Sequence, residues 1–91
     1  MTALLDGVTV DTVSADVVAE GPIVVTTTGL TKTGMVIIEA SIGGGYAVAY
    51  THSPGNPTSL SRLELPPGAV FKATLTGINP GDVVSVHYVG A

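Results

Sequence analysis

Residues Gly34 to Thr51 carry the clearest hydrophobic pattern of the chain, two runs of alternating side chains separated by three glycines. Side chains on a β-strand point to opposite faces with a period of two residues, so each run predicts a strand with a buried face. One face of the first strand would hold Val36, Ile38, Ala40 and Ile42; on the second, Tyr46, Val48 and Tyr50 alternate with smaller residues. Gly43-Gly44-Gly45 accepts the positive φ angles of a tight reversal, and the stretch therefore predicts a β-hairpin.

Similar runs recur about every ten residues, a spacing typical of all-β proteins. We expect strands at 7–13, Ile23–Thr28, Leu60–Leu65, Ala69–Gly77 and Asp82–Val89, and a strand or bend at 14–20. In the first of these strands Val8 and Val10 would point inward. Phe71, Ala73 and Leu75 would share one face of Ala69–Gly77, and Val84, Val86 and Tyr88 would share one face of Asp82–Val89. Pro22 lacks a backbone N–H, which predicts that the strand after it begins at a sheet edge. The fold class is all-β: a single antiparallel β-sandwich (Ig-like or small jelly roll) of seven or eight strands. Residues 1–91 form one domain, and residues 1–6 are a candidate N-terminal arm or edge strand.

The composition indicates surface that faces a partner. Hydrophobic residues make up 45% of the 91 residues and charged residues only 11%, and the mean hydropathy is +0.54. Typical soluble proteins carry about 25% charged residues. A small core cannot hide so much apolar surface, so we expect part of it to be covered by another subunit.

The charge pattern argues against nucleic acid and membrane partners. The net charge is −4, and the three cations are Lys32, Arg62 and Lys72, which form no basic cluster of the kind that phosphate backbones or anionic lipids require. The N-terminus lacks the basic and long apolar segments of a signal peptide. The longest stretch without Asp, Glu, Lys or Arg, Ala40 to Ser61, contains glycines and prolines that exclude a spanning helix.

No residue pattern predicts catalysis, a metal site or a cofactor. The chain has no cysteine, and its two histidines, His52 and His87, have no acidic neighbour in sequence at ligand spacing. We interpret His52 as a solvated loop residue and His87 as a packed or surface residue. The acidic residues Asp6, Asp11, Asp16 and Glu20 are spread over strands and turns rather than along one calcium loop. We therefore expect a protein that is not an enzyme.

Four segments carry a resemblance to small β-sandwich virion proteins of tailed bacteriophages, which are head-decoration or tail-associated subunits. They are LLDGVTV (Leu4 to Val10), VIIEASIGGGY (Val36 to Tyr46), LPPGAVFKATLTG (Leu65 to Gly77) and VVSVHYVGA (Val83 to Ala91). The tryptophan often seen after the glycine hairpin in that family is missing, and Tyr46 stands near its place. The resemblance implies a non-enzymatic, symmetric and often trimeric subunit bound to a capsid or tail.

LTGINPGDVVSVHYV (Leu75 to Val89) is similar to fibronectin type III and immunoglobulin-like modules at their Leu-x-Pro-Gly-x-x-Tyr corner. Ile78, Pro80 and Gly81 match this pattern, but Val84 occupies the tyrosine's place and the chain has no tryptophan. This second resemblance implies a binding module.

We therefore predict a structural protein of a bacteriophage virion, made in the host cytoplasm, that decorates or cements the capsid through apolar subunit contacts. Its partners would be major capsid or tail proteins and itself, with a trimer as one arrangement. The alternative is an Ig/fibronectin-like module that recognises a carbohydrate or protein surface through Tyr46, Tyr50 and the loops. The expected contact elements are residues 2–5, the Gly29–Gly34 loop and the Ser53–Thr58 loop. The candidate interface residues are Leu4, Leu5, Lys32, Tyr46, Tyr50, Pro54, Asn56 and Pro57.

Overall fold

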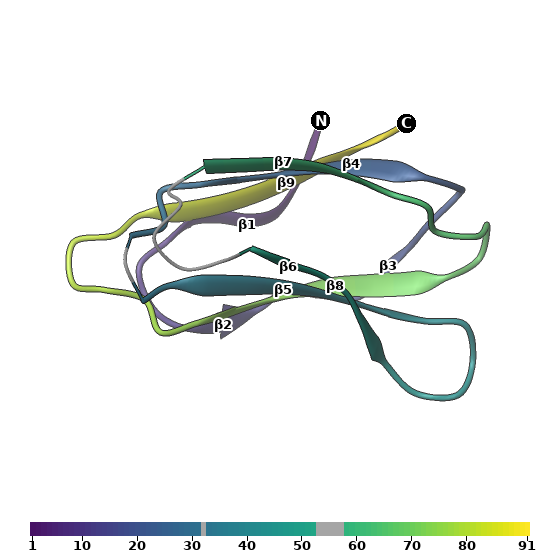
Figure 1. Cartoon of the computed structure of the whole chain (residues 1–91), viewed down its shortest axis with the longest axis horizontal. Coiled ribbons are helices and arrows are strands. Elements are labelled where there is room, and N and C mark those ends of the chain that lie inside the picture. Colours follow the sequence, from purple (N-terminus) through teal and green to yellow (C-terminus); the bar gives the residue numbers. More distant parts are fainter. Residues whose placement is uncertain (32, 53–57) are drawn as a thin grey trace.

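The computed structural model describes residues 1–31, 33–52 and 58–91, which form strands and turns and no helix. The nine strands in these residues are β1 (Thr2–Val8), β2 (Thr12–Val13), β3 (Val17–Val18), β4 (Ile23–Thr28), β5 (Met35–Ser41), β6 (Ala47–His52), β7 (Thr58–Leu63), β8 (Val70–Thr76) and β9 (Val84–Gly90). They build two sheets that lie face to face (Figure 1). No helix in the part of the chain that the structure describes is long and apolar enough to cross a membrane.

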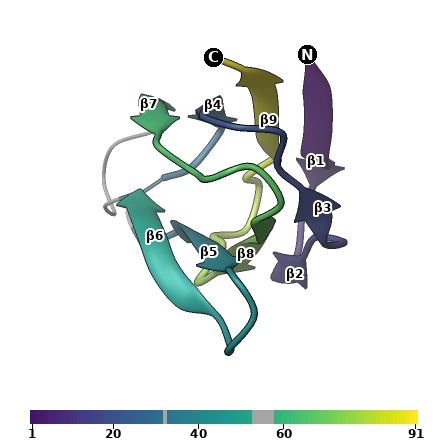
Figure 2. The ribbon, with the colours of Figure 1, turned by 90° about the vertical axis from the view of Figure 1, so that its right-hand side faces the viewer.

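The strand pairing is that of a jelly roll. The four-stranded sheet has the order β1-β9-β4-β7, and the five-stranded sheet has the order β2-β8-β5-β6, with β3 also paired to β8 (Figure 2). All pairs are antiparallel. Four of the pairings nest along the chain, namely β5 with β6, β4 with β7, β2 and β3 with β8, and β1 with β9, and the pairs β5–β8 and β4–β9 join them into the two sheets. Jelly rolls arrange eight strands in two such sheets, whereas the last two strands of an immunoglobulin sandwich are neighbours in one sheet. The predicted sandwich is confirmed, and its jelly-roll form fits the pairing.

The described strands number nine because one edge position is divided. β2 and β3 are two residues long each and lie one after the other along β8. Between them, Ser14 keeps the chain attached to β8: its backbone N–H donates to the carbonyl of Ala73, and its hydroxyl accepts from the N–H of Ala73 at 2.9 Å. A side-chain oxygen thus takes the place of a backbone acceptor where the strand breaks.

The core lies between the sheets and follows the predicted alternation. The inward faces of β5, β8 and β9 are buried as expected, and the most deeply buried residues on them are Val36, Ile38, Phe71, Ala73, Leu75, Val84 and Val86. Phe71 of one sheet and Tyr88 of the other meet edge to face, with ring centroids 5.1 Å apart at 90°. Such aromatic pairs are worth about 0.5–1.5 kcal/mol beyond the area they bury, so this contact ties the two layers together.

Two predicted inward residues are exposed because their strands end early. Val10 follows the end of β1 at Val8, where the chain turns toward the other sheet. Ile42 follows the end of β5 at Ser41 and lies in the glycine turn. The alternation of apolar residues continues past both strand ends, and the strand pairing does not.

The prediction that β4 lies at a sheet edge is wrong. β4 is central and pairs along its whole length with β7 on one side and β9 on the other. Pro22 is compatible with this position because it precedes the strand; its carbonyl accepts the N–H of Ala91 at 2.9 Å. The missing N–H therefore falls outside the ladder.

The interpretation of His52 as a solvated loop residue is also wrong. His52 is the last residue of β6, lies opposite Val36 and is only 1% exposed. The adjoining Pro and Gly residues predict a loop, but the loop begins one residue later than the composition suggests.

Candidate interaction surface

The outward side of the five-stranded sheet is the candidate interaction surface, and we call it the tyrosine face. It consists of the outward residues Val13, Val18, Ile37, Glu39, Tyr46, Val48, Val70, Lys72 and Thr74. Cross-strand pairing sets three rows over it: Val13 beside Thr74 beside Ile37, Lys72 beside Glu39 beside Val48, and Val18 beside Val70. Several of its apolar members are well exposed, including Val48 at 60%. Monomeric proteins rarely leave an extended apolar face uncovered.

Tyr46 lies within a small polar cluster on this face. The Lys72 ammonium sits 4.4 Å from the centre of the Tyr46 ring, in cation–π geometry. Hydrogen bonding to the Asp16 carboxylate, partial burial, and the negative charges of Asp16 and Glu39 together raise the pKa of Tyr46. Thr74 donates its hydroxyl to Glu39 at 3.2 Å. The ring is 40% exposed, and the Lys72 ammonium lies over it.

A bulge in the hairpin decides which β6 residues join the tyrosine face. The register runs from Val36 opposite His52 to Ile38 opposite Tyr50, and then shifts so that Glu39 lies opposite Val48. After this shift Val48 points outward although Tyr50 points inward. The sequence pattern assigns Tyr46, Val48 and Tyr50 to one side, because an extra residue in one strand leaves no mark in the alternation of that strand.

Of the eight predicted interface residues, four lie in the described part of the chain, and these four do not share one surface. Leu5 is 4% exposed and belongs to the core, because Thr2–Val8 forms a strand paired with β9 and not a free arm. Leu4 and Tyr50 are half-buried and pack against the core. Tyr46 lies on the tyrosine face. Lys32, Pro54, Asn56 and Pro57 lie outside the described residues.

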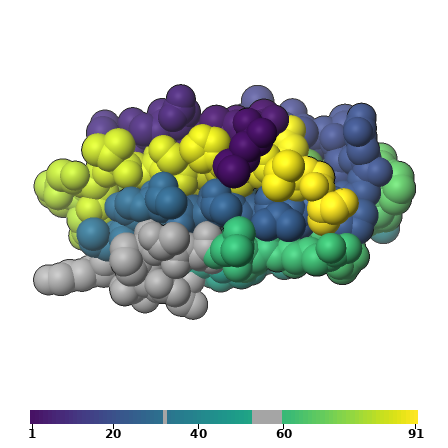
Figure 3. Space-filling model, turned by 90° about the horizontal axis from the view of Figure 1, so that it is seen from above, coloured from purple at the N-terminus to yellow at the C-terminus, as the bar shows by residue number. Residues whose placement is uncertain are grey.

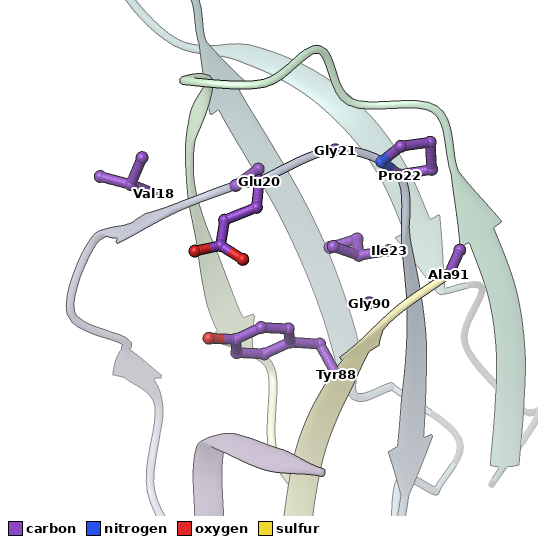
Figure 4. A pocket seen from close by; sticks show the side chains of 9 residues that line it. Val18, Glu20, Gly21, Pro22, Ile23, Tyr88, Gly90 and Ala91 are labelled. Atoms are coloured by element: carbon purple, nitrogen blue, oxygen red, sulfur yellow. The ribbon is translucent and has the colours of Figure 1, made fainter.

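A cleft of about 490 Å³ opens at one end of the sandwich, where the segment from β3 to β4 passes the end of β9. Its lining residues are Val18, Ala19, Glu20, Gly21, Pro22, Ile23, Tyr88, Gly90 and Ala91. Figure 4 shows the Glu20 carboxylate and the Tyr88 hydroxyl on the same side of this cleft. Glu20 is the one acidic side chain among these lining residues. The volume falls in the range of about 300–1,000 Å³ that small-ligand sites occupy.

Other chemistry is not assembled in the described part of the chain. No group of three or more His, Cys, Asp or Glu side chains converges there in a way that could hold a metal ion. Arg62 of β7 and Glu64, which follows the end of that strand, form an exposed ion pair. Comparisons with protein-family models, with curated proteins and with solved structures found no match.

Proposed function

We propose that the chain is a non-enzymatic structural subunit of a bacteriophage virion, which decorates or cements the particle through the tyrosine face. The observation that carries this proposal is the set of exposed valines on that face, in a chain with 45% hydrophobic and 11% charged residues. Burying apolar surface stabilises an association by about 25 cal/mol per Å² as an upper estimate, before the cost of immobilising the partners.

The fold supports this proposal as an analogy. Jelly rolls form viral capsid domains as well as lectins and cupins. The sequence resemblance to virion proteins of tailed phages points to the capsid class. The mixed character of the tyrosine face, with apolar positions around Lys72 and Glu39, suits a subunit that folds alone before it binds.

Particle composition tests this function directly. Phage particles from the strain that carries the gene would be purified on a density gradient and analysed by quantitative mass spectrometry. We expect the 9.1 kDa chain at a fixed stoichiometry to the major capsid or tail protein. A chain that is expressed during particle production but absent from the purified particles contradicts the proposal.

The face itself is tested by a charged substitution. Val48→Lys should abolish attachment to the particles, because an ammonium group would be desolvated in the contact. A matched variant, Leu60→Lys, changes a similarly exposed apolar residue on the other sheet (71% exposed, against 60% for Val48) and should leave attachment in place. Equal attachment of the Val48→Lys variant would exclude the tyrosine face as the contact.

A small-ligand function would use the cleft near Tyr88 instead of Tyr46 and Tyr50. The Lys72 ammonium lies over the Tyr46 ring, and Tyr50 is half-buried, so neither ring is fully open for stacking on a sugar. The Glu20 carboxylate and the Tyr88 hydroxyl are the polar side-chain groups among the lining residues that a neutral polyol would meet in the cleft. Saturable binding in a glycan titration, lost in Glu20→Gln, would favour this alternative.

A further inference from the structure

We propose that the edge of β7 that no described strand covers pairs with β7 of a second copy of this chain, which joins the two four-stranded sheets into one sheet across a two-fold axis. The argument concerns the backbone of the sheet edges and does not depend on the proposed virion function.

The other sheet edges carry features that discourage further pairing. The register of β1 on β9 shifts between Ala3 and Leu5 and again between Leu5 and Val8. The edge strand β6 carries the bulge described above. β2 and β3 offer only two residues each. Bulges and very short strands are devices by which natural proteins prevent edge-to-edge association.

The β7 edge has none of these features. Its six residues pair with β4 in unbroken register, from Thr28 opposite Thr58 to Ile23 opposite Leu63. The segment TSLSRL contains no proline or glycine, and within the described residues β7 pairs with β4 alone. Figure 3 shows β7 (green) along one margin of the four-stranded sheet, with β1 (purple) along the opposite margin. On such a strand, alternate backbone N–H and C=O groups point away from the sheet and accept a new strand.

The side chains of β7 fit a second copy of the same strand. Leu60 is 71% exposed and lies on the outer side of the sheet, opposite Thr26. A two-fold axis at Leu60 places the two Leu60 side chains across from each other, with Cβ atoms about 4.5–5.5 Å apart, where each covers the other.

Charge does not oppose this pairing, although the chain carries −4 overall. The charges beside the edge, Arg62 and Glu64, neutralise each other in an ion pair. With the axis at Leu60, Arg62 lies opposite the position of Thr58 in the other copy and not opposite a second arginine. The contact uses the same strand on both subunits, so it closes after two copies. It therefore gives a dimer, in contrast to the trimer that the resemblance implies.

Light scattering on the purified full-length chain tests the dimer. We expect twice the 9.1 kDa chain mass for the wild type, and the mass of one chain for Leu60→Lys, which sets two ammonium groups face to face. Val48→Lys is the matched control on the bulged edge strand and should remain dimeric. A wild-type monomer across a wide concentration range, a trimer, or a dimer that survives Leu60→Lys would each overturn the proposal. In the particle-binding assay the expected responses are reversed, because Val48→Lys should lose attachment and Leu60→Lys should keep it. A failure of the dimer can therefore be told apart from a failure of the proposed function.

A single-cysteine experiment fixes the position of the axis. The chain has no cysteine, so Leu60→Cys introduces a unique thiol. Cβ atoms of directly opposite residues lie close enough for a disulfide, and mild oxidation should give a covalent dimer on a non-reducing gel. Val48→Cys should remain uncrosslinked. A Leu60→Cys chain that folds but does not crosslink any better than Val48→Cys would exclude the axis at Leu60.

Discussion

Ser14 shows at the residue scale how a single hydroxyl supports the sandwich. It is 9% exposed, and its oxygen accepts the backbone N–H of Ala73 in the central strand β8. Ser85 makes the same kind of bond to the N–H of Gly7 at 2.9 Å, but at an exposed position. The two serines therefore differ in burial and share their hydrogen-bond chemistry.

We expect Ser14→Ala to lower the free energy of unfolding by about 1–3 kcal/mol, because it leaves a buried N–H without an acceptor. Ser85→Ala should cost no more than about 0.5 kcal/mol, because water replaces the exposed hydroxyl. Urea unfolding of both variants checks the prediction. Equal losses of unfolding free energy in the two variants would show that burial of the hydroxyl does not determine how much its hydrogen bond stabilises the fold.

Single residues also show which positions the sequence pattern can predict and which depend on tertiary contacts. The inward positions of Phe71 and Val86 follow from a period of two, which depends only on local backbone geometry. The burial of His52 does not, because it depends on where β6 ends against β5. The sequence predicts Tyr46 as an interface residue, but its contact with Lys72 joins residues far apart in the chain and has no local signal.

At the scale of elements, two loops are joined by hydrogen bonds at one end of the molecule, and we call this contact the clasp. The Thr31 hydroxyl, from the β4–β5 loop, donates to the Asp82 carboxylate of the β8–β9 turn at 2.8 Å, and the Asn79 side chain donates to the Thr31 carbonyl at 2.9 Å. The same loops approach closely at Gly29, where φ is +91° and an added Cβ would lie 1.9 Å from the carbonyl oxygen of Val83. This contact joins the two sheets where the chain crosses between them.

The clasp should make stability depend on pH. Burial alone would raise the pKa of Asp82, but hydrogen bonds from Thr31 and Asn79 outweigh it, so the pKa lies below its ordinary value. A carboxyl group with a lowered folded-state pKa stabilises the protein above its unfolded pKa, near 3.9, and this contribution is lost as the pH falls through the folded pKa.

We expect urea midpoints to fall more steeply with acidification in the wild type than in Asp82→Asn, which lacks the titrating group. The difference should be confined to the region below about pH 4, and Glu64→Gln, at an exposed position, serves as the control. Parallel pH profiles of the wild type and Asp82→Asn would contradict a role for Asp82 ionisation.

The sequence pattern predicts that a strand exists better than it predicts where the strand lies in its sheet. Pro22 indicates an edge strand, yet β4 is central, because sheet order is decided by which strands return to pair with it. β9 and β7, far apart in the chain, both do so. The division of one edge into β2 and β3 likewise depends on Ser14 bonding to β8 and not on a turn signal.

At the scale of the whole molecule, the nested pairing predicts the order of folding. β5 and β6 are separated only by the glycine turn, whereas β1 and β9 lie at opposite ends of the chain. Loop-closure entropy favours the local pair first, and each inner pair then brings the next one together. All-β topologies of this kind fold in milliseconds to seconds.

Two buried residues separate early from late pairing. Ile38 lies on β5 in the inner hairpin, and Leu5 lies on β1 in the outermost pair. Truncation of either to alanine should lower the free energy of unfolding by about 2–5 kcal/mol.

If β1 docks after the transition state, Leu5→Ala should mainly raise the unfolding rate, by about 100-fold for a loss of about 3 kcal/mol. Ile38→Ala should instead slow refolding, because its contacts form in the nucleus. Stopped-flow chevron plots of both variants measure this division. A slower refolding limb for Leu5→Ala with an unchanged unfolding limb would mean that closure of the outermost pair, and not the hairpin, organises the transition state.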